Sequence, residues 1–261
     1  MDERIKFYER CVDEMLISKN ASILVCGGGI LDKNVFHSLG YKNVIISNID
    51  GRINENEYEP YQWKYADAEN LPFDNDAFDY TVIYAAIHHT HSPHRVLTEM
   101  YRVSRNGLLV LESRDSFVMH LMEKFAIAET YECTAVYTNN CQHGGVNNTE
   151  IPNYIYRWTE REIEKTIQSY APYYQHEYVY KYGAAFSKIV ELERNAWFKK
   201  VFMNMAKPLY RVFTKIFPKQ GNQFACYVGK SDKREKLFPW LKMENGEIKF
   251  NKDWGNKKYK N

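Results

Sequence analysis

The sequence predicts an α/β protein built on a doubly wound sheet whose strands are mostly parallel. Two observations carry this expectation. Apolar, β-branched runs alternate with helical patterns through residues 1–115, and a glycine turn follows the first of those runs. The chain has 261 residues, of which 44% are hydrophobic, so it can bury one such domain with additions. We therefore expect a single large α/β domain rather than two independent cores.

The predicted elements follow from residue spacing. Short apolar or β-branched runs predict seven strands, at 22–26, 43–49, 63–66, 78–86, 107–113, 176–182 and 223–228. Apolar residues at helical spacing predict helices at 2–18, 32–39, 93–102, 117–129 and 159–170. Three of these helices have recognisable starts: Asp32 as a cap, Pro93 in a first turn, and a capping box that begins at Thr159.

Three segments lie outside the alternating pattern. We expect residues 1–230 to form the main domain, with an irregular Gly-, Asn- and Tyr-rich lid inserted at about 130–158. Residues 231–261 form a polar, Lys-rich C-terminal extension, part of which should pack because it contains two tryptophans. The basic, aromatic stretch 196–217 is expected to be an ordinary packed helix between the last two strands, and a membrane-surface helix is the alternative.

Composition excludes several classes of protein. The net charge is +2, which does not indicate a nucleic-acid partner. The five cysteines are scattered and form no CxxC pair, so neither a disulfide framework nor a structural zinc is expected. Charged side chains are spread through the first ten residues, so no secretory signal is expected there. No apolar run approaches the length of a membrane span. We therefore expect a cytoplasmic protein with no transmembrane segment.

A nucleotide-binding pattern follows the first predicted strand. Gly27, Gly28 and Gly29 lack side chains, which lets the backbone approach a ligand closely. Asp50 ends the second strand about 20 residues later, where a carboxylate can accept both hydroxyls of a ribose. A helix cap is the alternative role for Asp50. A dinucleotide-binding fingerprint would need a third glycine where this chain has Asp32. The motif therefore favours a nicotinamide-dependent oxidoreductase less, and that class of enzyme stays an alternative.

Further motifs in the same order carry a resemblance to a known family. The chain has YADAENLPF at 65–73, DAFD at 76–79, His88-His89 after the fourth strand, and LTEMYRVS at 97–104 before Gly107. Over roughly residues 20–115 it resembles the class I S-adenosylmethionine-dependent methyltransferases of the type 11 group. The resemblance implies a Rossmann-like seven-stranded sheet with an antiparallel last strand. It also implies S-adenosylmethionine as the cofactor and methyl transfer to a small-molecule acceptor.

The resemblance also implies roles for individual residues. The expected cofactor-binding residues are Gly27, Gly28, Gly29, Asp50, Gly51, Asp67, Ala68 and Ala85. Asp50 would bind the ribose hydroxyls, Asp67 the adenine amino group, and the strand end at Ala85 would run beside the sulfonium. Two departures from the family pattern are Val25, where an acid is usual, and Leu31, where a glycine is usual. They leave open a cofactor-binding subunit without catalytic activity.

Polar residues beyond the fourth and fifth strands are the candidates for catalysis. His89, or its neighbour His88, could accept a proton from an acceptor hydroxyl, and a purely structural histidine is the alternative. Arg114 could hold an anionic acceptor, unless it pairs with a nearby acid. No carboxylate lies beside these histidines in the sequence, so no metal site is expected.

The expected reaction is O-methylation of a small polar acceptor. Segment 151–172, IPNYIYRWTEREIEKTIQSYAP, is similar to methyltransferases from bacterial capsule and lipopolysaccharide gene clusters. That narrower resemblance implies a sugar nucleotide or a phosphoramidate-bearing capsule precursor as the acceptor.

Overall fold

A seven-stranded sheet forms the centre of the molecule in the computed structural model, which describes residues 3–15, 18–186, 197–230 and 237–259. The strand order is β3-β2-β1-β4-β5-β7-β6. The strands are β1 (Ser22–Cys26), β2 (Asn43–Asn48), β3 (Gln62–Tyr65), β4 (Phe78–Tyr84), β5 (Ser104–Ser113), β6 (Glu177–Gly183) and β7 (Gln223–Gly229). All seven predicted strands are present, with small shifts at their ends.

The sheet is parallel except at β7. Strands β3, β2, β1, β4 and β5 pair in parallel, whereas β7 runs antiparallel to both β5 and β6. The chain order reverses between β1 and β4, so their carboxyl ends form the crevice where open α/β sheets bind ligands. The predicted Rossmann-like sheet with an antiparallel last strand is therefore confirmed.

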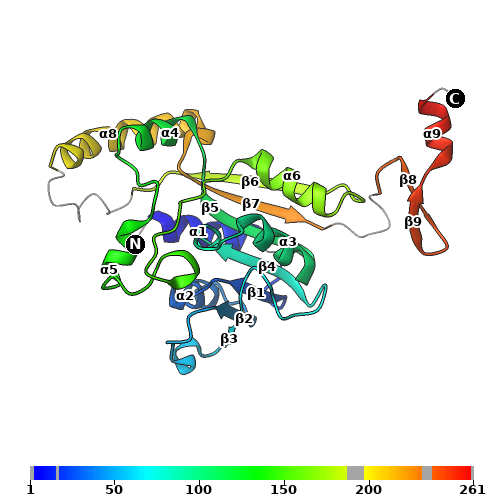
Figure 1. The fold of residues 1–261 in the computed structure, drawn as a ribbon, viewed down its shortest axis with the longest axis horizontal. Helices are drawn as coiled ribbons and strands as arrows, with labels where there is room; N and C mark the ends of the chain where they lie inside the picture. Colours follow the sequence, from blue (N-terminus) through cyan, green and yellow to red (C-terminus); the bar gives the residue numbers. More distant parts are fainter. Residues whose placement is uncertain (1–2, 16–17, 187–196, 231–236, 260–261) are drawn as a thin grey trace.

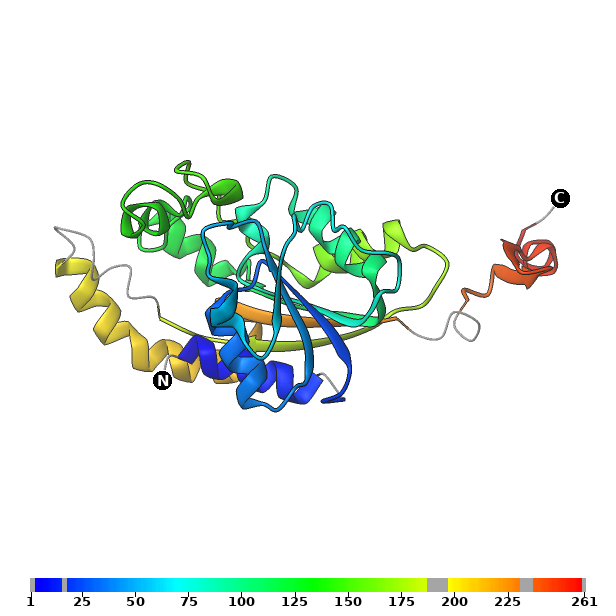
Figure 2. The same ribbon diagram turned by 90° about the horizontal axis from the view of Figure 1, so that it is seen from below.

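Helices cover both faces of this sheet (Figures 1 and 2). Helices α1 (Glu3–Met15) and α2 (Ile30–Ser38) pack on one face, where Tyr8, Val12 and Phe36 are fully buried. Helices α3 (Pro93–Val103) and α6 (Glu160–Tyr170) pack on the other face. The capping box predicted at Thr159 is confirmed, since its hydroxyl accepts from the Glu162 amide and Glu162 accepts from the Thr159 amide.

Helix α2 begins earlier than expected, and Asp32 has a different position in it. Gly29 is the cap, and Asp32 lies in the first turn with its carboxylate accepting from the Gly29 amide at 2.8 Å. The hydroxyl of Tyr8, from α1, donates to the same carboxylate at 2.7 Å. The glycine turn is therefore fixed to the helix layer by a buried acid.

The lid segment is ordered by short-range contacts. After α4 (Phe117–Lys124), which ends earlier than predicted, residues 130–158 form α5 (Cys133–Thr138) and the 3₁₀ turn η3 (Val146–Asn148). The Glu132 amide donates to the Asn153 carbonyl and the Ile155 amide to the Thr130 carbonyl, each at 2.9 Å. These bonds close the lid into a loop whose two ends lie together beside β5.

Helix α8 (Trp197–Ile216) contradicts the expectation of an ordinary packed helix. None of its residues is buried, although most of its side chains are apolar. Its ends join β6 and β7 in the chain, but it lies along the edge of the molecule rather than in a core (Figures 1 and 2). No helix in the described part of the chain is both long enough and apolar enough to cross a bilayer.

The C-terminal residues form a small unit of their own at the opposite end of the molecule from α8 (Figure 1). It comprises the hairpin β8 (Leu241–Glu244) and β9 (Glu247–Phe250) followed by α9 (Lys252–Lys258). The rings of Trp240 and Trp254 lie 5.8 Å apart between centroids, so the two tryptophans of the extension do pack. Residues 231–236 lie outside the described part.

Candidate active site

Two cavities meet at the carboxyl ends of the parallel strands. The smaller, of about 240 Å³, lies over the ends of β1, β2 and β4, and the larger, of about 360 Å³, lies beyond the ends of β4 and β5. Ala85, the residue directly after β4, lines both. The two cavities are therefore adjacent at this residue.

The smaller cavity gathers most of the residues that the sequence assigned to cofactor binding. Gly27, Asp50, Asp67, Ala68 and Ala85 all line it. They come from four different segments of the chain, and the parallel strands bring them to one edge. The remaining predicted residues, Gly28, Gly29 and Gly51, do not line it.

Gly27 is required by the backbone geometry of this turn. Its φ is +61°, a conformation that favours glycine, and a Cβ there would lie 2.7 Å from the Cβ of Ala86. Gly28 is also closely surrounded, because a Cβ on it would lie 2.9 Å from the side chains of Val25 and Ile46. Gly29 has no heavy atom within 4 Å of the same hypothetical Cβ, so its role is only to cap α2.

Asp50 lines the smaller cavity as an ionised carboxylate. The Arg52 guanidinium binds both of its oxygens, at 2.7 and 2.8 Å, and lowers the pKa of Asp50 to about 2. Asn148, from the lid, also hydrogen-bonds Asp50 and favours its ionised form. The acid that was predicted to hold a ribose is therefore charged at neutral pH.

The lid forms one wall of the smaller cavity, which the sequence did not indicate. Gly144, Gly145, Asn147 and Asn148 all line it. The lid was expected to close over an acceptor, and the structure shows that it borders the cofactor side as well. Its glycines and asparagines are typical of irregular loops, so composition alone could not distinguish a ligand-facing loop from a solvated one.

His88 is held between two carboxylates. Its Nδ1 lies 2.8 Å from Glu112, at the end of β5, and its Nε2 lies 3.3 Å from Glu132 of the lid. Burial alone would lower the pKa of His88, but these two carboxylates raise it to about 10. Burial likewise opposes ionisation of Glu132, but bonding to His88 lowers its pKa to about 2. His88 is therefore an imidazolium at neutral pH, which excludes the general-base role predicted as an alternative to His89.

His89 has the opposite electrostatic environment. Burial lowers its pKa, and the positive charge on His88 lowers it further. The two rings lie 4.6 Å apart between centroids on one 3₁₀ turn, η2 (Ile87–His89), yet His88 lines the larger cavity and His89 the smaller. The Glu132 carboxylate, 3.4 Å from His89 Nε2, acts in the other direction, but the net effect of this environment is a lowered pKa, which favours the neutral imidazole that a general base needs.

The same cluster offers donor atoms to a metal ion, which the sequence did not predict. One atom each from His88, His89 and Glu132 lies within 4.8 Å of the others. Glu132 is remote in sequence, so spacing could not reveal the grouping. However, His88 meets a carboxylate at each ring nitrogen, so it would have to lose a proton before it could bind a metal. The ion pairs explain why these side chains lie together, so we interpret the group as an ion cluster.

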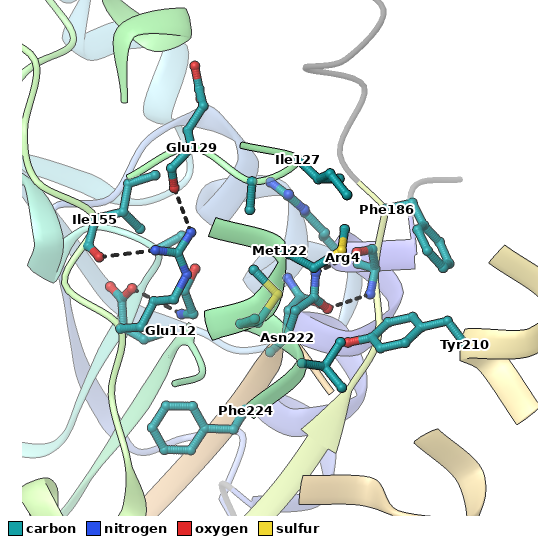
Figure 3. A pocket seen from close by; sticks show the side chains of 18 of the residues that line it. Arg4, Glu112, Met122, Ile127, Glu129, Ile155, Phe186, Tyr210, Asn222 and Phe224 are labelled. Atoms are coloured by element: carbon teal, nitrogen blue, oxygen red, sulfur yellow. Dashed lines mark hydrogen bonds between the residues drawn. The ribbon is translucent and has the colours of Figure 1, made fainter. Parts of the chain in front are cut away.

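The larger cavity is mainly apolar, with a few charged side chains in its lining, among them Glu112 and Arg4 (Figure 3). Its apolar lining residues come from β5, α4, the lid, α8 and β7, and they include Leu111, Val118, Met119, Met122, Ile127, Ile155, Phe202, Met203 and Phe224. The charged lining residues include Glu112, Glu132 and Arg157. Arg157 is bound by Glu123 and by the Glu129 carbonyl, so its charge is already matched by the protein.

Arg114 does not take the anion-binding position expected for it. It lines neither cavity, and its guanidinium pairs with Glu160 at 2.8 Å and also donates to the Lys219 carbonyl. These bonds fasten β5 to α6 and to the turn before β7. The role proposed for Arg114 in binding an acceptor was wrong, and the alternative, pairing with a nearby acid, is what the structure shows.

The His88 cluster predicts a specific pH dependence of stability. In an unfolded chain histidine has a pKa of about 6.5, whereas the folded protein raises the pKa of His88 to about 10. The stabilisation from this proton is therefore complete below pH ~6.5 and is lost as the pH rises toward ~10. Urea unfolding of the wild type and His88→Gln should show a difference in unfolding free energy that shrinks across this range.

The exposed His37 of α2 provides the control. His37→Gln should leave the wild-type pH dependence of stability unchanged. If the wild-type and His88→Gln curves run parallel between pH 7 and 10, the cluster does not hold a proton on His88.

Comparison with known proteins finds a family match for part of the chain. Residues 25–111, from β1 to β5, match a family model described as a methyltransferase domain. No curated protein is a detectable relative of the chain in sequence. That matched segment contains the glycine turn, Asp50, Asp67, Ala85 and His89.

Solved structures of S-adenosylmethionine-dependent methyltransferases share the fold. The protein from Thermotoga maritima is 16% identical, with a TM-score of 0.52 over 87% of this chain and 89% of that one. The protein from Methanosarcina mazei is 16% identical, with a TM-score of 0.51 over 84% and 96%. The protein from Mesorhizobium loti is 9% identical, with a TM-score of 0.53 over 85% and 97%. The chain therefore has the Rossmann-like fold of these methyltransferases, and its residues 25–111 are similar to a methyltransferase domain.

Proposed function

We propose that this protein transfers the methyl group of S-adenosylmethionine to an oxygen of an acceptor whose apolar part occupies the larger cavity. The observation that carries the proposal is that Ala85 lines both cavities, while His89, whose pKa is lowered, lines the smaller one next to His88, which lines the larger. In-line methyl transfer needs little from a protein beyond alignment of two ligands and, for a hydroxyl acceptor, a base.

The smaller cavity fits S-adenosylmethionine in its chemistry. Gly27 leaves room for a ligand against Ala86, which a side chain at that position would fill. Asp50 offers an ionised acceptor for ribose hydroxyls, and Asp67 with Ala68 lies where the adenine would bind. Val25 is buried in the core and Leu31 packs beside it, and neither lines the cavity. The two departures from the family pattern therefore do not remove a ligand contact here.

Both alternative functions receive less support. For a nicotinamide-dependent oxidoreductase, the turn before α2 should bind a pyrophosphate, but the Asp32 carboxylate already occupies the Gly29 amide and would repel it. A non-catalytic binding subunit would need no cavity beside the cofactor, whereas this chain has one of about 360 Å³ there. Catalysis is the function for which both cavities are needed.

The chemical step divides between the cofactor and four side chains. A bound cofactor would supply a methyl group activated by a sulfonium. The acceptor oxygen would form the new bond to that carbon as the carbon–sulfur bond breaks, and His89 would take the hydroxyl proton. His88 positions His89 through the turn they share, and burial together with the His88 charge lowers the pKa of His89. Glu112 and Glu132 fix His88 in place.

The cavity lining favours a more apolar acceptor than the sugar nucleotide expected from the sequence. Methionine, leucine, isoleucine and phenylalanine side chains cover most of it, and of its two arginines, Arg4 and Arg157, the second is matched by carboxylate and carbonyl groups and the first also has an interaction partner. A phosphate-bearing acceptor would need a free cationic partner. We therefore propose an acceptor with one reactive hydroxyl near His89 and an alkyl or aromatic body beyond it.

Asp50 and Arg52 allow a paired test of the cofactor site. Both Asp50→Ala and Arg52→Ala remove the same ion pair, but only the first removes the acceptor for the ribose hydroxyls. Calorimetry with S-adenosylhomocysteine should show a loss of about 1–3 kcal/mol, roughly 5- to 150-fold in Kd, for Asp50→Ala. Arg52→Ala should bind nearly as the wild type. Equal losses in both would show that the ion pair, not the carboxylate, supports binding.

His89 can be tested as the base against a histidine in the same segment. His89→Gln should lower kcat by about 10²- to 10⁴-fold while S-adenosylhomocysteine binding changes little. His91→Gln, an exposed neighbour that lines neither cavity, should keep wild-type activity. Because burial and His88 lower the His89 pKa, the wild-type rate should fall only below pH ~6.5. A retained kcat in His89→Gln would refute the assignment.

The apolar acceptor can be tested with a homologous series of alkyl alcohols. Each added methylene should raise wild-type kcat/KM by about fourfold, the equivalent of about 0.8 kcal/mol, until the cavity is full. Met122→Lys places an ammonium in the cavity wall and should abolish this gain, whereas Leu121→Lys, on the exposed side of α4, should not. A flat chain-length dependence in the wild type would rule out an apolar acceptor.

A further inference from the structure

Helix α8 presents a continuous apolar face to solvent. Its exposed large apolar residues, together with the residue that follows the helix, are Trp197, Phe198, Val201, Phe202, Met205, Leu209, Val212, Phe213, Ile216 and Phe217. They recur at spacings of three and four residues, so they form one stripe along the helix. Met205 and Leu209, near the middle, are 71% and 73% exposed. A stripe this large on one helix marks an interaction surface.

The opposite side of α8 holds the helix against the domain. Met203, Ala206 and Tyr210 line the larger cavity, and the Tyr210 hydroxyl donates to the Gln220 carbonyl at 3.0 Å. The Arg211 guanidinium pairs with Glu3 of α1 at 2.6 Å. The apolar stripe therefore faces outward because the inner side of the helix is already in use, as Figure 3 shows for Tyr210 beside the cavity.

The charge of α8 has a single sign. The helix contains no aspartate or glutamate, and its charged residues are Lys199, Lys200, Lys207, Arg211 and Lys215. On a helix of 3.6 residues per turn, Lys200, Lys207, Arg211 and Lys215 follow one edge of the apolar stripe. A basic edge beside an exposed aromatic and aliphatic face is the pattern of a helix that lies in the interface of an anionic membrane.

We propose that α8 docks this protein, flat along the helix, onto an anionic lipid surface. The lysines would meet lipid phosphates while the aromatic and aliphatic stripe enters the boundary between headgroups and acyl chains. The absence of acidic residues distinguishes this from a surface that pairs with a second copy, because two identical basic helices would repel each other.

Docking through α8 would also place the larger cavity at the lipid surface. Phe202 belongs both to the exposed stripe and to the cavity lining, so the stripe continues into the cavity wall. Helix α4 borders the same cavity through Met119 and Met122, and its Phe117, like Phe125 directly after the helix, is exposed. An acceptor with an apolar body could thus pass from the lipid surface into the cavity without crossing water.

Vesicle sedimentation tests the proposal with the full chain. Wild-type protein should sediment with vesicles that contain phosphatidylglycerol in phosphatidylcholine, bind pure phosphatidylcholine vesicles more weakly, and lose affinity as salt is added. The double variant Met205→Asp/Leu209→Asp changes only exposed residues that line neither cavity. Its vesicle affinity should fall by about tenfold or more. Its affinity for S-adenosylhomocysteine should stay at the wild-type value, which shows that the domain is folded.

A control of equal charge separates the helix from a general surface effect. Ile151→Asp/Met243→Asp replaces two exposed apolar residues elsewhere and should bind vesicles as the wild type does. The proposal is overturned if the wild type does not bind anionic vesicles, or if both double variants lose affinity equally. It is also overturned if the wild type is a dimer by light scattering and Met205→Asp/Leu209→Asp is a monomer, because α8 would then pair with a second copy.

Discussion

The ion cluster of Glu112, His88 and Glu132 is the interaction on which the site depends. It joins side chains from the end of β5, the turn after β4 and the lid. The cost of burying a charged imidazole is offset because each ring nitrogen meets a carboxylate. Removing either carboxylate would leave a buried, partly unpaired charge. The cluster therefore fixes the lid to the sheet and sets the protonation state of both histidines.

Most of the sheet was predictable from the sequence because each strand carries its own signal. β5 has a continuous apolar run, GLLVL, that packs against helices on both faces, and the capping box at Thr159 marks the start of α6. Several lining residues of the smaller cavity were predictable for the same reason. Glycine at 27 and acids at 50 and 67 are local features, and the parallel topology alone brings them to one edge.

The features that were missed depend on contacts between distant residues. The partner of Arg114 is Glu160, on α6, and nothing near Arg114 in the sequence indicates it. Likewise, the charge on His88 comes from Glu112 and Glu132, which belong to a strand and to an irregular loop. Periodicity identified α8 as a helix but could not decide whether its apolar face was covered, because an interior helix and an interfacial helix have the same pattern.

The lid links the two halves of the site through its own residues. Asn148 bonds Asp50 beside the smaller cavity, while Glu132 bonds His88 beside the larger one. Because one segment walls both cavities, a movement that opens either cavity would break contacts at the other. Opening would also remove Glu132 from both histidines, since its carboxylate lies 3.3 Å from His88 Nε2 and 3.4 Å from His89 Nε2. The charge of Glu132 raises the pKa of each ring, so the position of the lid and the protonation of the histidine pair are coupled through one carboxylate.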